Sequence, residues 1–542
     1  MTQSYWHQGI IWLIVLTLSA CQPPPVEVHR PPPLPQDPFV QVYFNHSPST
    51  TYKEPYRLVT RPGDNLEQII AQAIATAQST VDVAVQELRL PQIAQALVKR
   101  HQAGVRVRVI VENTYNRPWS EVSAQDIANL PPRERDRAQE NLRLIDRNND
   151  GKLTPTEINQ RDALVILRNA GVPILDDTAD GSQGSGLMHH KFVVVDGYTV
   201  MVTSANFTTS DIHGDFQAPD SRGNANNLLK IESVELANSF TEEFNQMWGD
   251  GPGGAPDSRF GLKKPQRPAQ QVTLADTTVV VRFSPTSPTQ PWSQSSNGFI
   301  DQILQSATQT IDLALFVFSE QRLADQLQTA HEQGVQVQAL IDPSFAYRYY
   351  SEGLDLLGVA LSNQCRYEAR NRPWQNPIAT VGVPKLPSGD LLHHKFGVID
   401  GKMVITGSHN WSASANTQND ETLLVINSPL VAAHFEREFE RLYTNAILGV
   451  PVAVQRSIQN QQQSCPQITQ ADDPNAPSFR GIVNLNTATQ EELETLPGIG
   501  PKLAERIITA RSQKPFTSLA DLDQVSGVGP HLLQQLDGRV TW

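Results

Sequence analysis

Two copies of one polar pattern are the part of this sequence that is suited to chemistry. Each copy has a histidine, a lysine two residues later, an aspartate five residues after the lysine, and then a serine and an asparagine. The ten residues are His189, Lys191, Asp196, Ser204 and Asn206 in the first copy and His393, Lys395, Asp400, Ser408 and Asn410 in the second. These residue types fit the cleavage of a phosphodiester, which needs a nucleophile, a proton donor and positive charge around the phosphoryl oxygens. Such a set needs no metal ion, so we expect no cofactor for catalysis.

The local sequence indicates which histidines act. Apolar residues follow each lysine in the alternation typical of a strand, on which residues two apart share a face. His189 therefore points to the same side as Lys191, and His190 to the other. One imidazole can attack phosphorus and form a phosphohistidine, while the other protonates the leaving oxygen. By the same spacing we expect His393 to be catalytic, and His190 and His394 to be packed as scaffold.

A repeated α/β unit must position the two patterns. A strand, a helix and a strand precede the first pattern, and the same order returns 230 residues later, where Thr310 corresponds to Thr80. Apolar strands joined by a helix favour a parallel sheet with crossover helices. We therefore predict two halves, at 39–250 and 273–448, joined by a Gly- and Pro-rich linker at 251–272.

The composition limits the classes of protein that this chain can belong to. A length of 542 residues predicts about three domains. The net charge of -13 argues against a surface that holds nucleic acid by bulk electrostatics, although a local basic cleft remains open.

The first residues resemble an export signal. Residues 10–18 are an apolar run of nine, too short to span a bilayer. The run Leu-Ser-Ala-Cys that ends at Cys21 resembles the lipobox of bacterial lipoproteins. We therefore expect a signal at 1–21, lipidation of Cys21 and a membrane-anchored lipoprotein of a bacterial cell envelope. Residues 1–9 depart from the pattern because they hold no Lys or Arg, so a plain signal with secretion, or an N-terminal membrane anchor, is the alternative.

The segment after the signal and the other cysteines are interpreted in the same setting. Residues 22–38 are rich in proline and predict a stiff linker between anchor and body. No Cys-x-x-Cys spacing exists, which argues against a cysteine zinc site. If Cys21 is lipidated, Cys365 and Cys465 could pair in a disulfide in an oxidising compartment.

The first half carries an insertion ahead of its pattern. From Gly104 to His189 is 85 residues and from Gly334 to His393 is 59, so the first half has about 26 more. The insertion, about 116–168, contains a loop that matches a calcium-binding EF-hand at its diagnostic positions. The matching residues are Asp146, Asn148, Asp150, Gly151 and Glu157, with Lys152 contributing its backbone carbonyl.

The flanks of this loop, 132–145 and 157–168, have helical character, as an EF-hand requires. We expect the loop to bind Ca²⁺ in a structural role beside the site. An Asx-rich surface turn is the alternative.

A separate module follows a linker at 449–478. Within residues 479–542, two hairpins resemble the tandem helix-hairpin-helix module that binds DNA. The residues expected to contact DNA are Gly498, Gly500, Lys502, Gly527 and Gly529. Glycine hairpins aim backbone N–H groups at a phosphate, so binding would be independent of base sequence. Residues 480–542 hold six Lys/Arg and seven Asp/Glu, net -1, and a hairpin module used for protein contact is the alternative.

The paired patterns, each after its repeat, resemble the phospholipase D superfamily over about 400 residues. The resemblance implies an α/β fold, a duplicated βαβ sandwich, here with a small all-α helix-hairpin-helix domain. It implies that His189 is the nucleophile and His393 the acid, with the lysines and asparagines clamping the phosphate and the serines supporting them. For Asp196 and Asp400 it leaves a structural role as open as a direct one. Both half-sites lie in one chain, so we expect a monomer.

The two halves differ after their asparagines. The superfamily tends to place a glutamate there to orient a histidine, and Glu421 fits in the second half, whereas Asn226 stands in the first. We expect Glu421 to support His393, because a carboxylate stabilises the imidazole cation. The first half would then be less active or differently supported, and a binding-only protein remains an open interpretation.

These features together favour an exported, non-specific, metal-independent DNA endonuclease. The C-terminal module is the discriminating feature, since a lipid hydrolase gains nothing obvious from it. The alternative is a phospholipase D that hydrolyses phosphatidyl lipids, which a lipid anchor would keep at the membrane. The second alternative is a surface DNA-binding protein with a degenerate site.

Overall fold

The computed structural model describes most of the chain. The described residues are 30–182, 186–465, 468–470, 483–488, 501–536 and 539–542, together with Gln490, Leu493, Leu496 and Ile499. The predictions on Cys21, Gly498 and Gly500 concern residues outside these ranges. Within the described ranges, no helix has both the length and the apolar character needed to cross a membrane.

The first half forms a seven-stranded sheet with the order β1-β9-β8-β7-β4-β5-β6. Its strands are β1 (Val40–Phe44), β9 (Asn227–Glu232), β8 (Thr199–Thr203), β7 (Lys191–Val195), β4 (Thr80–Val85), β5 (Arg106–Val111) and β6 (Ile174–Asp176). β4, β5 and β6 are parallel, as predicted, whereas β7 pairs antiparallel to β4 and leads into antiparallel β8 and β9. The sheet is therefore mixed.

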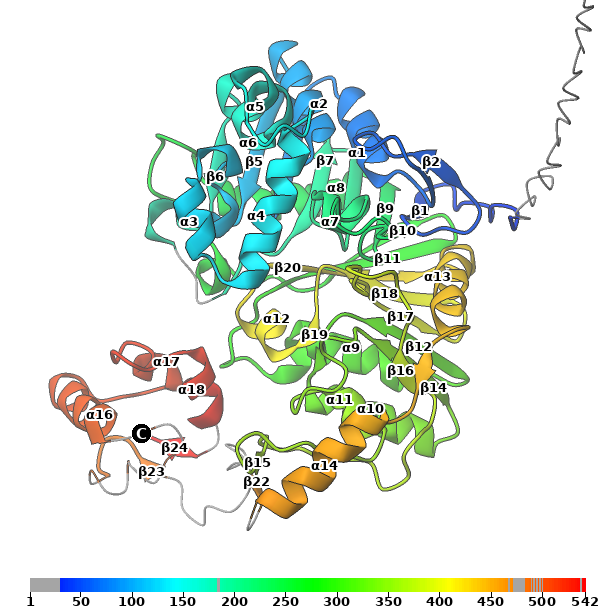
Figure 1. The fold of residues 1–542 in the computed structure, drawn as a ribbon. Helices are drawn as coiled ribbons and strands as arrows, with labels where there is room; N and C mark the ends of the chain where they lie inside the picture. Colours follow the sequence, from blue (N-terminus) through cyan, green and yellow to red (C-terminus); the bar gives the residue numbers. More distant parts are fainter. Residues whose placement is uncertain are drawn as a thin grey trace, which may run out of the picture.

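The second half repeats this sheet with nine strands, in the order β10-β11-β20-β18-β17-β12-β14-β16-β21. The strands are β10 (Gln270–Leu274), β11 (Thr277–Ser284), β20 (Glu421–Asn427), β18 (Met403–Gly407), β17 (Lys395–Ile399), β12 (Thr310–Leu315), β14 (Gln336–Ile341), β16 (Val381–Val383) and β21 (Ile447–Leu448). β12 again lies between a parallel and an antiparallel neighbour. The predicted duplication is confirmed, and the two halves lie one above the other in Figure 1.

Two amphipathic helices fill the space between the sheets. α8 (Val234–Trp248) contacts β4, β7 and β8 of its own half and β10 and β11 of the other, and α13 (Pro429–Tyr443) contacts β1 and the strands of the second half. Phe240 of α8 packs on Phe192 and Phe283, at centroid distances of 5.0 and 5.2 Å, and so joins both halves in one apolar core.

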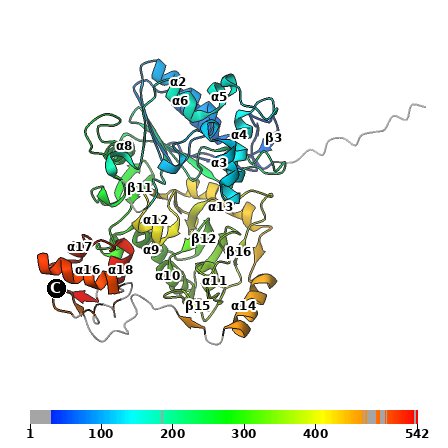
Figure 2. The ribbon, with the colours of Figure 1, turned by 60° about the vertical axis from the view of Figure 1, so that its left-hand side comes forward.

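The outer faces of the sheets carry the crossover helices. α1 (Leu66–Ala75) and α2 (Pro91–Gln102) cover the first sheet, and α9 (Ser296–Gln305) and α10 (Gln321–Glu332) cover the second. The result is a stack of helices, sheet, helices, sheet and helices, which confirms the predicted α/β sandwich (Figure 2).

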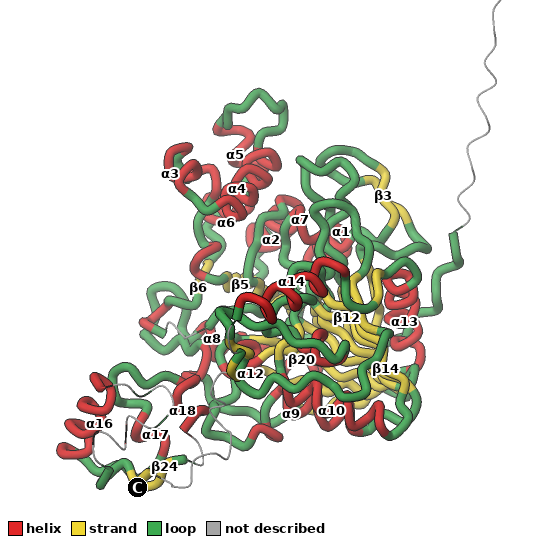
Figure 3. Tube along the Cα trace, turned by 60° about the horizontal axis from the view of Figure 1, so that its bottom comes forward, coloured by secondary structure: helices red, strands yellow, loops and turns green. Residues whose placement is uncertain are grey.

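Four helices make up the insertion between β5 and β6. They are α3 (Ala124–Asn129), α4 (Pro132–Ile145), α5 (Pro155–Arg161) and α6 (Ala163–Asn169), gathered together in Figure 3. α4 has the predicted bounds. The helical character expected at 157–168 is confirmed in two helices divided at Asp162, whose extended backbone ends α5 and whose carboxylate accepts from the Ser120 amide and hydroxyl.

Two segments predicted as linkers are packed against the body. Arg437 Nη1 donates to the carbonyl of Pro32 at 2.8 Å, and Asp37 is buried, so the proline-rich segment lies along the second half from residue 30 onward. In the segment 251–272, Phe260 is buried, and the buried Lys264 pairs with Asp420 at 2.6 Å and with Glu243. A buried cation needs such partners, which fix the connection in place.

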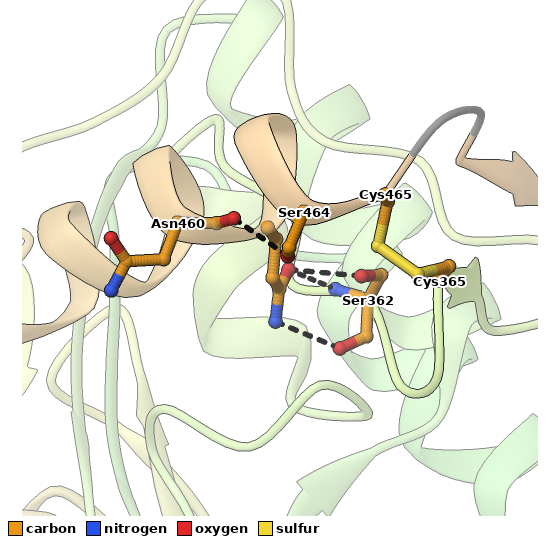
Figure 4. The surroundings of a disulfide bond; sticks show 6 residues. Ser362, Cys365, Asn460, Ser464 and Cys465 are labelled. Atoms are coloured by element: carbon orange, nitrogen blue, oxygen red, sulfur yellow. Dashed lines mark hydrogen bonds between the residues drawn. A yellow bond between two sulfur atoms is a disulfide. The ribbon is translucent and has the colours of Figure 1, made fainter.

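The first part of the predicted linker at 449–478 is likewise packed against the body. α14 (Val452–Ser464) leads into Cys465, which forms a disulfide with Cys365, so the hypothesis of this pairing is confirmed (Figure 4). Gln461 accepts from the Ser362 amide and donates to its carbonyl. Beyond the disulfide, β22 (Thr469–Gln470) pairs with β15 (Arg366–Tyr367).

The C-terminal module has its own small core. Its helices are α16 (Pro501–Gln513), α17 (Leu519–Leu522) and α18 (Pro530–Leu536), and two short strands, β23 (Val483–Asn484) and β24 (Val540–Thr541), pair beside them. The core residues include Leu485, Leu493, Ile507, Leu522 and Leu536. The module is thus helical as predicted, with one added pair of strands.

Candidate active site

Two short parallel bridges bring the halves together at the paired patterns. Met188 pairs with Asp420, and Ala225 pairs with Leu392. The amide of His189 donates to the carbonyl of Asp420 at 3.0 Å, and that of His393 to the carbonyl of Ala225 at 3.1 Å. Both histidines line one pocket of about 200 Å³, so the predicted shared site is present in the structure.

Because of these bridges, each catalytic histidine is hydrogen-bonded to a residue of the other half. Nδ1 of His189 lies 2.7 Å from Oε2 of Glu421, and Nδ1 of His393 lies 3.0 Å from Oδ1 of Asn226. The expectation that Glu421 supports His393 is therefore wrong. Glu421 begins β20 and Asn226 directly precedes β9, and each follows a residue that forms a bridge to the other half, next to the histidine it supports. Local spacing does not reveal this arrangement.

The serines and asparagines of the patterns divide into two tasks. Ser204 Oγ donates to Oδ1 of Asn226, and Ser408 Oγ donates to Oε2 of Glu421, both at 2.7 Å. The serines therefore position the histidine partners. The side-chain oxygens of Asn206 and Asn410 are buried and have no hydrogen-bond partner in the described part of the chain. These oxygens are acceptors and cannot bind an anion, whereas the Nδ2 groups of the same side chains are the donors that a phosphate needs.

The two lysines put buried positive charge beside the histidines. Nζ of Lys191 donates to the carbonyl of His189 at 2.9 Å, and Nζ of Lys395 to that of His393 at 2.7 Å. Burial lowers the pKa of Lys191 to about 8. Burial and the charge of Lys191 lower the pKa of Lys395 well below its usual value. A bound anion would offset both effects, so the site favours an anionic ligand.

The histidines have lowered pKa values for the same reasons. Burial lowers the pKa of His189 to about 4, and the charge of Glu421 opposes the shift. Burial, Lys395 and Lys191 lower the pKa of His393 well below 6.5. Burial acts to raise the pKa of Glu421, but His189 and Lys191 outweigh it and bring the value to about 2. At neutral pH the site therefore holds neutral imidazoles beside an ionised carboxylate.

The aspartates of the patterns lie outside the site. Each ends its strand, five residues beyond the lysine and so roughly 16 Å along it. Asp196 accepts from the amides of Ser79 and Thr80, and Asp400 accepts from those of residues 308–310. Their placement among the catalytic residues is wrong, and the structural role left open is the one they have: both fasten the turn before a neighbouring strand.

The neighbouring histidines are scaffold, as predicted. Nε2 of His190 lies 3.1 Å from Glu243 of α8, and Nε2 of His394 lies 3.0 Å from Glu438 of α13. Both rings are fully buried. They fasten the catalytic strands to the two central helices.

The rest of the pocket is lined by residues that the patterns do not contain. These are Gln86, Glu87, Tyr115, Arg137, Asn141, Thr208, Thr209, Ser210, Asp211, Asn224, Phe316 and Leu391. Gln86 and Phe316 follow β4 and β12 at matching places of the repeat, a signal that could have identified them. Arg137 and Asn141 lie four residues apart on one face of α4, and no motif marks them.

The EF-hand-like loop has part of the expected arrangement. Asp146 accepts from the amide of Gly151 at 2.9 Å, and Asp150 accepts from that of Lys152 at 2.8 Å. Gly151 has the left-handed φ of 76° that this turn requires. Glu157 instead accepts from Thr154 in a capping box at the start of α5. In the described residues no group of three or more His, Cys, Asp or Glu is arranged for a metal ion.

The second hairpin of the C-terminal module is described. Gly527 has a φ of 98°, and an added Cβ would lie 2.7 Å from the guanidinium of Arg506, so glycine is required there. Gly529 directly precedes α18. Lys502 lies in the first turn of α16. The described hairpin thus presents its backbone at a helix start, as the predicted phosphate contact needs.

Two family models match the chain. One is described as "Cardiolipin synthase, PLD-like domain" and matches residues 70–248 and 300–443. The other is described as "Helix-hairpin-helix motif" and matches residues 479–541. Both predicted resemblances are confirmed at the level of the family.

Curated relatives align with a single stretch of the chain. A mitochondrial cardiolipin hydrolase of Mus musculus is 30% identical over 155 residues, which are 28% of this chain and 60% of that protein. The mitochondrial cardiolipin hydrolase of Chlamydomonas reinhardtii is 29% identical over 149 residues, which are 28% of this chain and 57% of that protein. A phospholipase D of Rickettsia typhi is 27% identical over 150 residues, 28% and 64%. The chain thus spans about three fifths of the relatives it matches.

The solved structures that are similar to this chain are more distant in sequence. Nuc of Salmonella typhimurium, a phospholipase D family member, is 21% identical, with a TM-score of 0.25 over 32% of this chain and 100% of that chain. The phosphatidylserine synthase of Haemophilus influenzae is 15% identical, with a TM-score of 0.45 over 78% of this chain and 93% of that chain.

Replacing Glu421 by Gln tests the exchange of partners. Because the charge of Glu421 raises the pKa of His189, Glu421→Gln should lower it further below about 4, as measured by NMR titration of the imidazole. The same carboxylate should make the stability of the protein depend on pH. The pKa of Glu421 falls from 4.5 to about 2 on folding, so its contribution to the free energy of unfolding is present above pH 4.5 and is lost as the pH falls through 2. The variant should lack this dependence.

The matched control is Glu438→Gln, which removes a buried carboxylate from the scaffold residue His394. It should leave the titration of His189 unchanged. If Glu421→Gln instead moved the pKa of His393 and not that of His189, the pairing described above would be incorrect.

Proposed function

The chain belongs to the phospholipase D-like family, and from that membership and the geometry of the cleft we propose that it is a phosphodiester hydrolase. The family match covers residues 70–248 and 300–443, more than half of the chain. The observation that carries the proposal is the single pocket where His189 and His393 meet beside two buried lysines.

We assign the nucleophile to His189. Attack by its Nε2 forms a P–N bond as the bond from phosphorus to the leaving oxygen breaks, and the ring becomes cationic. The carboxylate of Glu421 at Nδ1 stabilises that charge as it develops. His393 has the neutral amide of Asn226 at Nδ1, and the carboxylate of Asp211 is further away at 3.7 Å, so its support for becoming a cation is weaker.

His393 then acts as the acid. A bound phosphodiester offsets the lysine charges that hold its pKa low, so His393 takes up a proton at Nε2. It donates this proton to the leaving oxygen. Water next attacks phosphorus and breaks the P–N bond, and His393 accepts the proton from that water, which restores both histidines.

The remaining polar groups hold the phosphate. Lys191, Lys395, Asn206 and Asn410 surround the histidines and can donate to the non-bridging oxygens as negative charge accumulates. The chain's own residues supply each proton and each charge in this scheme, so we propose a reaction without a metal ion.

We propose DNA as the substrate, with cleavage independent of base sequence. The supporting observation is the helix-hairpin-helix match at 479–541 on the same chain as the site. Such hairpins contact phosphates rather than bases. The alternative is a phosphatidyl lipid, which the names of the curated relatives favour. A DNA-binding protein with an inactive site is the third possibility, and a monomer is expected in each case.

A side-by-side assay in EDTA tests this proposal. Plasmid DNA should be nicked, and quenching in alkaline detergent should trap ³²P on His189, because the P–N bond of a phosphohistidine is labile in acid. Replacing His189 or His393 by Asn should lower the rate by about 10³-fold or more, because each removes an essential group. The control is His101→Asn on the outer helix α2, which should keep full activity. Cleavage of phosphatidylcholine alone would overturn the DNA assignment, and full activity of His189→Asn would overturn the shared site.

We also propose that the loop at 146–157 binds Ca²⁺ as a structural ion. Asp146 supports this, because one of its carboxylate oxygens is buried without a hydrogen-bond partner in the described part of the chain. Glu157 would have to leave its cap to complete the shell. Adding Ca²⁺ to chelator-treated protein should raise the melting temperature by a few degrees. The Asp146→Asn/Asp150→Asn variant should not respond, and an unchanged wild-type value would contradict the proposal.

Export with a lipid anchor on Cys21 is the third part of the proposal. The sequence Leu-Ser-Ala-Cys supports it, and so does the Cys365–Cys465 disulfide, since such bonds persist in oxidising compartments. Cys21→Ser should move the protein from the membrane fraction to the soluble envelope or medium and remove labelling by palmitate. Membrane association of this variant equal to that of the wild type would argue for the uncleaved anchor or against lipidation.

A further inference from the structure

The insertion reaches the catalytic pocket through helix α4. Arg137 and Asn141 of this helix line the same pocket as His189 and His393. Apart from His393, the second half contributes to this lining only apolar residues, Phe316 and Leu391. The pocket thus has one polar wall, where Arg137 lies with the carboxylates of Glu87 and Asp211, and one apolar wall. The cation comes from a segment that the other half lacks.

The charge of Arg137 is kept next to the reacting groups. Nη1 donates to the hydroxyl of Tyr115 at 2.8 Å, and this phenol is neutral. Glu87 and Tyr115 raise the pKa of Arg137 further. Glu87 has its own partner, since Arg89 Nε lies 3.0 Å from it. A guanidinium has five N–H donors in a planar fork, and the phenol takes one of them.

Helix α4 holds this arginine rigidly. Glu140, three residues further along, accepts from the backbone amides of Phe216 and Gln217 at 2.6 and 3.2 Å. Asn141 donates to the carbonyl of Arg137 at 2.9 Å. A group carried on a fixed helix positions a substrate more accurately than one on a loop.

We infer that Arg137 is a positioning residue that binds a second phosphate, next to the one being cleaved, of a single nucleic-acid strand. This inference rests on the proposed hydrolase function. The lysines lie beside the histidines and serve the scissile phosphate, whereas the guanidinium fork on the pocket wall matches a further phosphate in two parallel hydrogen bonds.

The opposite wall favours an unpaired strand. Phe316 lines the pocket, and its ring lies 4.8 Å from that of His393 and 4.7 Å from Nζ of Lys395, so a base flanking the scissile phosphate would meet an aromatic side chain beside the site. His189 and His393 are each only 7% exposed, and a base must leave its stack to approach them. The helix-hairpin-helix match favours nucleic acid over a lipid with two phosphates.

Oligonucleotides with single neutral methylphosphonates test the inference. In the wild type, one such replacement beside the cleaved linkage should lower kcat/KM about tenfold or more, because it removes a charge-assisted contact. In Arg137→Met the all-phosphate substrate should be slowed by the same factor, and the same methylphosphonate should cost nothing further. Additive losses would overturn the inference, since they would mean that the two groups do not meet.

Controls separate positioning from damage to the site. Arg137→Met should hydrolyse bis(p-nitrophenyl) phosphate, which has one phosphate, within about twofold of the wild type, because a positioning residue for a second phosphate is not used there. Arg143→Met, on the exposed side of the same helix, should cleave the oligonucleotide normally. An equal loss on both substrates, or no loss on either, would overturn the inference.

Failure of this inference and failure of the proposed function would give different results in these assays. If the wild type hydrolysed neither substrate, the hydrolase proposal itself would fail. If it hydrolysed bis(p-nitrophenyl) phosphate and a lipid with two phosphates but no oligonucleotide, the hydrolase would stand and the assignment of Arg137 to a nucleic-acid strand would be wrong.

Discussion

The active site depends on an exchange between the two halves of the chain. Glu421 of the second half pairs with His189 of the first, and Asn226 of the first pairs with His393 of the second. The pairs are buried, so neither partner has water to replace the other. Neither half is therefore a complete catalyst, and the central helices and the buried Lys264 keep the halves in the register that the exchange needs.

The exchange also explains how a duplicated fold can separate two chemical roles. Two equivalent histidines with equivalent partners would compete for the same proton and the same charge. A carboxylate on one side and an amide on the other make one imidazole better at bearing a positive charge and the other better at losing a proton. The residues that line the pocket also differ between the two halves. Gln86 and Phe316 occupy matching positions of the repeat, but one is polar and the other is apolar.

Local patterns predicted the parts of this arrangement that depend on neighbours in the sequence. The alternation around His189 distinguished it from His190, and the repeat of apolar strands predicted the duplicated sheets, because both follow from strand geometry. The partner of each histidine could not be predicted, since it depends on which strand ends meet across the halves. Asp196 was misplaced for the converse reason: its five-residue interval from Lys191 along a strand puts it at the far end of that strand.

The same limit applies to Arg137. Its helix was predicted with the correct bounds, but the direction of that helix over the pocket follows from contacts with residues 216–217, far along the chain. The proline-rich segment and the connection at 251–272 had linker composition, and buried groups within them, such as Asp37 and Phe260, attach them to the body. Composition indicates how flexible a segment is by itself, but it does not predict which parts of the fold the segment packs against.

The disulfide at the end of α14 determines where the C-terminal module is tethered. The chain is fastened to the second half as far as β22, and twelve residues separate Gln470 from Val483, the first described residue of the module. A span of that length reaches at most about 45 Å. The module is therefore held within that distance of a fixed point, and a nucleic-acid strand bound to it, as proposed above, would have a local concentration on the order of millimolar around that point. Successive encounters of one strand with the pocket then become intramolecular events, limited by the tether and not by diffusion from solution.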